Sequence, residues 1–168
     1  MPALKINKEK YKAVILFLAN KIQNCTLGKV KLMKLLYYAD FDFFEKTDKS
    51  ITNDVYVRLP LGPVPQNAEE IIDEMVSDGL IKIERQRMSV GMNDRLLIIP
   101  LKGMNLALLS KEEIEMLENV SQKWEKFSGN EMRDASHGEA PWIATKPNCI
   151  IDYNLAYYRN KYDRMKDM

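Results

Sequence analysis

The segment over residues 27–45 is apolar enough to predict a helix that is buried on more than one side. It contains no proline, and its only glycine is Gly28. A surface helix has one apolar stripe, whereas a helix that is apolar around most of its girth lies between neighbours. With helical spacing this segment has two stripes: Leu32, Leu35, Leu36, Ala39 and Phe43, and Val30, Met33, Tyr37, Phe41 and Phe44. Four polar residues form the remaining edge, which we expect to face solvent: Lys31, Lys34, Asp40 and Asp42.

Helical spacing of apolar residues predicts helices in further segments around this central one. These segments are residues 8–23, 67–78, 110–127, 128–137 and, more weakly, a basic and aromatic tail over about 153–166. A serine followed three residues later by glutamate is the capping-box signature of a helix start. It occurs at Ser110 and Ser128, and Asn67 gives a relaxed version.

Alternation of apolar and polar residues predicts a β-hairpin over about residues 80–101, with a polar turn between Arg87 and Arg95. A further short strand over residues 55–58 is left open. Residues 59–65 hold three prolines, which exclude helix and favour extended or turn geometry. Helices and strands do not alternate as in βαβ units, so the fold class is α+β, mostly α, around the buried helix.

Composition indicates one ordinary globular domain spanning residues 1–168. Net charge is only +1, yet residues 1–34 carry eight lysines and one acid, and residues 40–84 carry eleven acids and four bases. Such a dipolar surface can steer a partner. Two isolated cysteines, Cys25 and Cys149, fit a reduced cytoplasmic protein. We expect no signal peptide and no membrane span.

His137 is the only histidine and the one candidate for acid–base chemistry. It would have to work with Glu139 or Cys149, and no motif supports a Cys–His nucleophile. At the end of a short helix an imidazole can instead serve local carbonyls, and we expect Trp142 to pack into the core. No phosphate loop, nucleophile elbow or histidine-based metal site is present. We therefore expect no enzyme, no metal and no cofactor, and a small enzyme using His137 stays a remote alternative.

The helix over residues 67–78 followed by the hairpin resembles the end of a winged-helix domain, in which a helix enters the major groove. That helix carries five acids and no Lys or Arg, so phosphates would repel it. The hairpin does carry Arg85, Arg87 and Arg95. A DNA-binding transcription regulator is therefore kept as the alternative function.

Three motifs in this order resemble the Panacea domain family, which includes SocA-like antitoxins and phage-associated GepA-type proteins. The first is KLMKLLYYA at residues 31–39, and the second is Gly62-Pro63-Val64. The third is a short helix with His137 followed by Pro141 and Trp142. The resemblance covers about residues 10–145, and Leu61 stands where the family commonly has an aromatic residue.

The resemblance implies a cytoplasmic antitoxin that neutralises a protein toxin by direct binding. The toxin would be encoded by an adjacent gene, and SocA-like members also act as adaptors that deliver a toxin to a cytosolic AAA+ protease. Residues 55–65 and 136–147 are the expected partner surface. The candidate partner-binding residues are Tyr56, Arg58, Gly62, Pro63, Val64, His137, Pro141 and Trp142.

Overall fold

The computed structural model describes residues 5–22 and 27–159. Cys25 and most of the predicted tail helix lie outside the described residues. Where that helix was expected to start, the chain instead forms a short 3-10 turn, η1 (Tyr153–Tyr158). Cys149 is a free, exposed thiol. None of the helices in the described ranges has the length and apolar character needed to cross a membrane.

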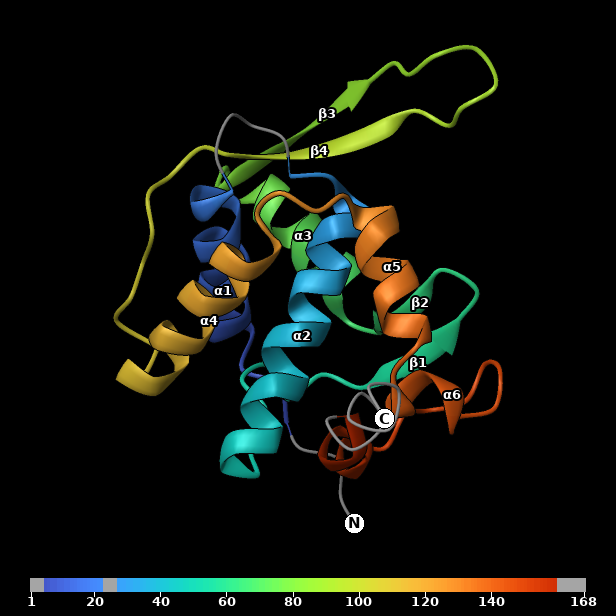
Figure 1. The fold of residues 1–168 in the computed structure, drawn as a ribbon. Coiled ribbons are helices and arrows are strands. Elements are labelled where there is room, and N and C mark those ends of the chain that lie inside the picture. The colour runs from blue at the N-terminus through green and yellow to red at the C-terminus, as the bar shows by residue number, and fades with distance from the viewer. Residues whose placement is uncertain (1–4, 23–26, 160–168) are drawn as a thin grey trace.

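The described residues form six α-helices, of which the second is the predicted central one (Figure 1). They are α1 (Lys8–Lys21), α2 (Lys29–Thr47), α3 (Ala68–Ser77), α4 (Lys111–Trp124), α5 (Gly129–His137) and α6 (Ala140–Ile143). Helix α2 contacts α1, α4, α5 and η1, and it also contacts one strand of each of the two β-hairpins described below. This confirms the α+β, mostly α fold with a buried central helix. Helix α6 is a single turn that follows directly after α5.

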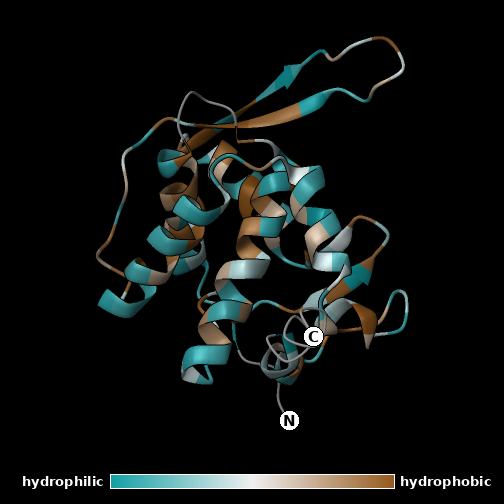
Figure 2. Ribbon diagram, in the orientation of Figure 1, coloured by the Kyte–Doolittle hydropathy of each residue, from teal (hydrophilic) through white to brown (hydrophobic). Residues whose placement is uncertain are grey.

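Apolar burial on α2 follows the prediction at eight of the ten stripe positions, whereas the polar edge does not face solvent. Val30 is 40% exposed and Phe44 is only partly buried. Lys31, Lys34 and Asp40 are buried, with Asp40 fully inaccessible. The expectation of a solvated edge on α2 was therefore wrong, because neighbouring segments supply hydrogen-bond partners for these polar groups, as buried polar atoms require. In Figure 2, α1 and most of β4 are hydrophobic, in keeping with a core between helices and hairpin.

Helix starts follow their sequence signals where serine precedes them. Ser110 and Ser128 each accept from the backbone N–H of a glutamate three residues on, and each glutamate closes the capping box. Asn67 precedes α3 but makes no side-chain cap, contrary to the prediction, because its amide donates to Asp54 instead. Val76 of α3 is 41% exposed, whereas Ile71, Ile72 and Met75 of the same helix are buried.

The predicted hairpin is present as β3 (Ile81–Gln86) and β4 (Arg95–Pro100), and it projects beyond the helices (Figure 1). Ile81 pairs with Pro100, and Ile83 pairs with Ile98. Ile81 and Ile98 are buried, whereas Ile83, farther from the body, is 37% exposed.

A second hairpin joins β1 (Tyr56–Leu59) to β2 (Gly62–Pro65), so the further strand left open by the sequence exists and has a partner. Residues 148–151 run antiparallel along the other side of β1, where Arg58 N–H donates to Cys149 O at 3.0 Å. Pro63 and Pro65 lie opposite Arg58 and Tyr56, whose backbone groups bond to residues 148–151 instead. The missing proline N–H groups therefore cost this sheet no hydrogen bond.

Candidate functional site

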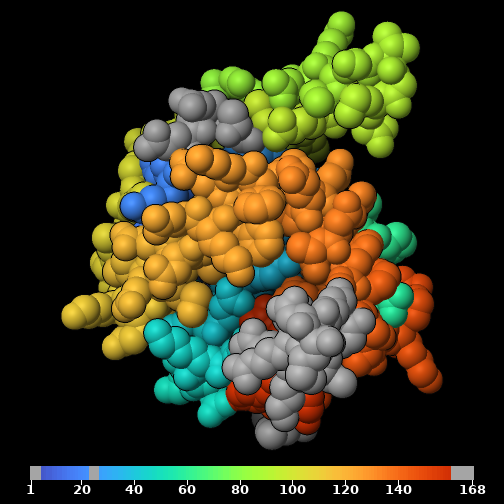
Figure 3. Space-filling view, viewed as in Figure 1, coloured from blue at the N-terminus to red at the C-terminus, as the bar shows by residue number. Residues whose placement is uncertain are grey.

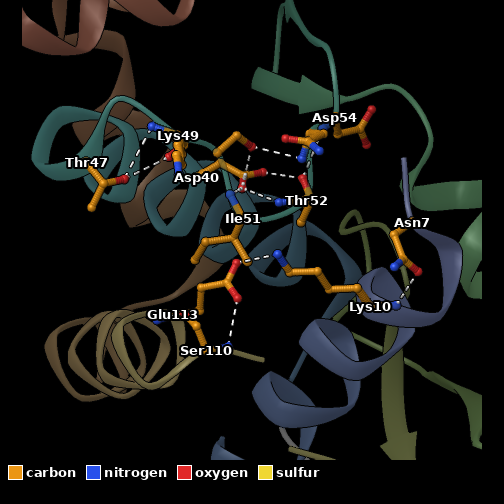
Figure 4. Close-up of polar contacts among 12 residues, drawn as sticks. Asn7, Lys10, Asp40, Thr47, Lys49, Ile51, Thr52, Asp54, Ser110 and Glu113 are labelled. Atoms are coloured by element: carbon orange, nitrogen blue, oxygen red, sulfur yellow. Dashed lines mark hydrogen bonds and ion pairs between the residues drawn. The ribbon is translucent and has the colours of Figure 1, made fainter. Parts of the chain in front are cut away.

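Asp40 fixes the chain that leads into β1. Its buried carboxylate accepts hydrogen bonds from the backbone N–H groups of Ile51 and Thr52, both at 2.9 Å (Figure 4). It also accepts from the hydroxyls of Ser50, Thr52 and Tyr56 at 3.0, 2.5 and 2.6 Å. Burial raises the pKa of this carboxyl, and the bonds from Thr52 and Tyr56 act in the opposite direction. Asp40 is thus a structural group that holds residues 50–56 against α2.

Asp54 ties the same turn to α1 and α3. Its carboxylate accepts from the Tyr11 hydroxyl at 2.6 Å and from the Asn67 side chain at 2.8 Å. Lys10 of α1 also forms an ion pair with Glu113 of α4 (Figure 4). The strand that begins at Tyr56 is therefore positioned by three helices.

Gly62 lies where β2, α2 and α5 approach one another most closely. Its φ is +105°, and a Cβ there would lie 3.0 Å from Lys34 Nζ and 3.1 Å from Ser136 Oγ. Lys34 Nζ donates to Pro63 O at 2.7 Å. Burial, with a smaller contribution from the Arg133 charge, lowers the pKa of this ammonium to about 7. The conformation of Gly62-Pro63-Val64 therefore depends on glycine and on a lysine of the central helix.

Trp142 of α6 packs beside β1 and is only half-buried, so the expectation that it enters the core was wrong. The Arg58 guanidinium carbon lies 3.6 Å from its ring centroid, and the His137 ring stacks on it at 4.0 Å. Arg58 also donates to the carbonyls of Trp142 and Thr145 at 3.2 and 2.6 Å. Arginine and the indole hold each other by cation–π attraction and by main-chain bonds, which joins α6 to β1.

His137 ends α5, and burial lowers the pKa of its imidazole, with the Arg133 charge acting in the same direction. Its buried Nε2 has no hydrogen-bond partner among the described residues. The ring stacks on Trp142, and its Nε2 does not bond to a helix-end carbonyl of the described residues. The described contacts include no hydrogen bond from His137 to Cys149 or Glu139.

Glu139 is engaged elsewhere, beneath the site. Its carboxylate accepts from the Tyr37 hydroxyl at 3.3 Å and lies 3.5 Å from Arg159 Nη1. Burial raises the pKa of Glu139 to about 7, against the opposing effect of Arg159. Arg159 also contacts Asp42 at 2.6 Å and Glu45 at 3.0 Å. The acids of α2 and the turn before α6 therefore share one buried guanidinium.

Three apolar residues lie side by side across the β1–β2 hairpin and the segment that bridges to it. Val57 lies opposite Val64 of β2 and forms an isolated bridge with Ile150, so the three side chains share one face. Ile150 is 68% exposed, and Leu61 in the hairpin turn is 53% exposed. We name these four residues the sheet surface. The bridge between Ile150 and β1 was missed by sequence reasoning, since it joins residues 93 positions apart, Val57 and Ile150.

The structure brings the eight predicted site residues together around one small sheet, although they come from two segments about 70 residues apart. Four are buried and hold the scaffold: Tyr56, Gly62, Pro63 and Pro141. The other four are partly exposed: Arg58, Val64, His137 and Trp142. Leu61 and Ile150 are more exposed than any of the eight, and exposure is the one signal that would have pointed to them.

Comparison with protein families gives one match. The model described as "Antitoxin SocA-like, Panacea domain" matches residues 32–143, about two thirds of the chain, from α2 through α6. No curated protein and no solved structure matches the chain. The matched range contains all eight candidate residues and all three motifs apart from Lys31, the first residue of the first motif. The chain therefore belongs to the Panacea-domain family of SocA-like antitoxins.

Proposed function

We propose that this protein is an antitoxin that neutralises a protein toxin by binding it directly, with the sheet surface as the centre of contact. Family membership supports the antitoxin role. The proposed place of the contact surface rests on one observation: two family motifs that are distant in the sequence lie together beside exposed apolar side chains. Large apolar side chains that stay exposed on a rigid support are typical of protein-binding sites.

Hydrogen bonds from side chains fix the loops and short strands beneath this surface. Asp40 accepts a hydrogen bond from the chain that precedes β1, Lys34 donates to Pro63 O, and Arg58 donates to a carbonyl that follows α6. A surface fixed in advance loses little conformational entropy when a partner binds. The geometry therefore suits recognition of a folded toxin by a preformed face.

Catalysis is not part of this proposal. His137 is stacked on Trp142, and Glu139 is bonded to Tyr37 and Arg159, so the two side chains do not form an acid–base pair. A DNA-binding role is also disfavoured, because the exposed residues of α3 include Glu69, Glu70 and Asp73.

The toxin should be encoded by an adjacent gene and should be met in the cytoplasm. Expression of that toxin alone is expected to stop growth, and co-expression with this protein to restore it. The two proteins should then purify together from the same cells. Persistent growth arrest in the presence of folded antitoxin would contradict the proposal.

A proteolytic adaptor would act differently from a direct inhibitor. In cells that lack the cytosolic AAA+ protease, direct inhibition should still restore growth, whereas an adaptor should fail. The toxin level, followed by immunoblot, should stay constant for direct inhibition and should fall for an adaptor when the protease is present.

A further inference from the structure

The β3–β4 hairpin has one covered edge and one open edge. On the β4 side, Ile98 N–H donates to Leu27 O at 2.8 Å, and Leu97 forms a bridge with Gly28. No strand and no backbone hydrogen bond from the described ranges lies on the other side of β3. Figures 1 and 3 show β3 at the outer margin of a hairpin that extends away from the helices. A six-residue open edge is a template for another strand.

The register identifies which backbone groups face outward. Leu101 N–H donates to Leu80 O, so bonded pairs within the hairpin occur at Leu80 and every second residue after it. Ile83 and Arg85 lie between these positions. Their N–H and C=O groups therefore point to the open edge, where they can bond to an antiparallel strand.

The side chains along this edge carry a charge pattern that complements itself. Lys82 and Glu84 flank Ile83, share one face of the strand, and lie 2.8 Å apart as an ion pair about half exposed to solvent. If a second β3 pairs antiparallel about a twofold axis at Ile83, Lys82 of each copy lies opposite Glu84 of the other. Opposite charges across a strand pair stabilise it, and like charges destabilise it.

Other positions of the twofold axis do not place Lys82 opposite Glu84 of the second copy. The outward hydrogen-bonding groups restrict the axis to whole residue positions. An axis at Lys82, Glu84 or Arg85 places that charged residue opposite its own copy. The register centred on Ile83 avoids any like pair, and it brings together two Ile83 side chains that are each 37% exposed.

We propose that β3 is a self-association edge: two copies of the chain pair through it, antiparallel and centred on Ile83, to form a continuous four-stranded sheet. Such an interface is isologous, as most homodimer interfaces are. It lies on the projecting hairpin, apart from the sheet surface (Figure 1). The proposal is therefore independent of toxin binding.

Sedimentation over a range of concentrations tests the proposal on the full chain. The wild-type protein should approach twice the 19.5 kDa mass of one chain. Lys82→Glu and Glu84→Lys should each weaken dimerisation by roughly tenfold, since each places like charges opposite one another. The double variant should restore the dimer, and an equimolar mixture of the two single variants should form a mixed dimer.

Ile83→Pro removes an outward N–H without touching the bonds between β3 and β4, so it should give a folded monomer. Wild-type protein that stays monomeric at all concentrations would overturn the proposal. Two further outcomes would do the same: single charge variants that dimerise like wild type, or a monomer in which Ile83→Pro impairs toxin binding, which would assign the edge to the toxin.

Discussion

Gly62 is the residue on which the geometry of the candidate site depends most. Its positive φ is a conformation that L side chains rarely adopt, and Lys34 and Ser136 occupy the space that a Cβ would need. The family motif Gly-Pro-Val therefore has a physical reason at its first position. The backbone must turn closely past the central helix.

Gly62→Ala is expected to lower the free energy of unfolding by about 2 kcal/mol, because strain at positive φ adds to crowding against Lys34 and Ser136. Urea denaturation measures this change. Gly103→Ala is the matched control, since a Cβ there meets nothing within 4 Å and its φ is not positive. Equal stabilities of the two variants would contradict this account of Gly62.

Lys34 links the stability of the fold to pH. Its pKa is about 7 in the folded protein and 10.5 for an unperturbed lysine, so the unfolded chain binds more protons between these limits. Stability should therefore rise with pH above about 7, by at most roughly 1.4 kcal/mol per pH unit. Glu139, with a pKa of about 7, is already largely ionised there and adds little slope.

Lys34→Met should flatten this rise, because methionine fills the space without titrating. Unfolding free energies measured at about pH 7.5, 8.5 and 9.5 give the slope for both proteins. Lys29→Met, at a more exposed lysine of α2, is the control and should keep the wild-type slope. A variant at Lys34 that retains the slope would show that another group is responsible.

Among the elements, the helices were largely predictable from sequence, and the polar contacts between them were not. Ser110 and Ser128 act through residues three positions away, so local sequence contains the whole signal. Asp40 and Lys34 find partners at Thr52, Tyr56 and Pro63, which only the folded chain brings close. A helical pattern cannot show that a charged position will be buried and bonded.

The same distinction explains the candidate site. Gly62 and Trp142 were found because they lie in family motifs, whereas Ile150 lies in no motif and pairs with β1 through the tertiary fold. Trp142 was expected in the core and was also one of the candidate partner-binding residues. Its stacking with Arg58 depends on where α6 meets β1, which the order of elements does not specify.

The C-terminal turn η1 is joined to α2 chiefly through Arg159, at its end. This guanidinium is buried and serves Asp42, Glu45 and Glu139. Tyr153 adds an aromatic stack on Phe41. The family match ends at residue 143, so this closure of the fold lies beyond the matched range.

Arg159→Met is expected to destabilise the protein by about 3 kcal/mol at pH 8, because it leaves partly buried carboxylates without a counter-charge. The loss should shrink near pH 5, where Glu139, with its raised pKa, is protonated. Thermal and urea unfolding at both pH values measure the effect. Arg85→Met, at a largely exposed arginine, should change stability by less than about 0.5 kcal/mol. A pH-independent loss for Arg159→Met would contradict the role given to Glu139.

At the scale of the whole molecule, the buried residues that support the small sheet differ from the residues of the proposed contact surface. The central helix and its buried polar partners hold a small sheet, and the sheet presents Val57, Leu61, Val64 and Ile150 outward. The projecting hairpin lies apart from it and offers the proposed self-association edge (Figure 1). We therefore expect that variants can alter toxin binding and the proposed self-association independently.

The most direct test of the central claim is the affinity of the purified protein for its toxin, measured by calorimetry with variants of the sheet surface. Leu61→Asp and Ile150→Asp should each weaken binding by at least about tenfold, since each places a charge in an apolar contact. Leu106→Asp, at a leucine 43% exposed outside the sheet surface, should bind like wild type. Wild-type affinity in both sheet-surface variants, with folding intact, would contradict the account.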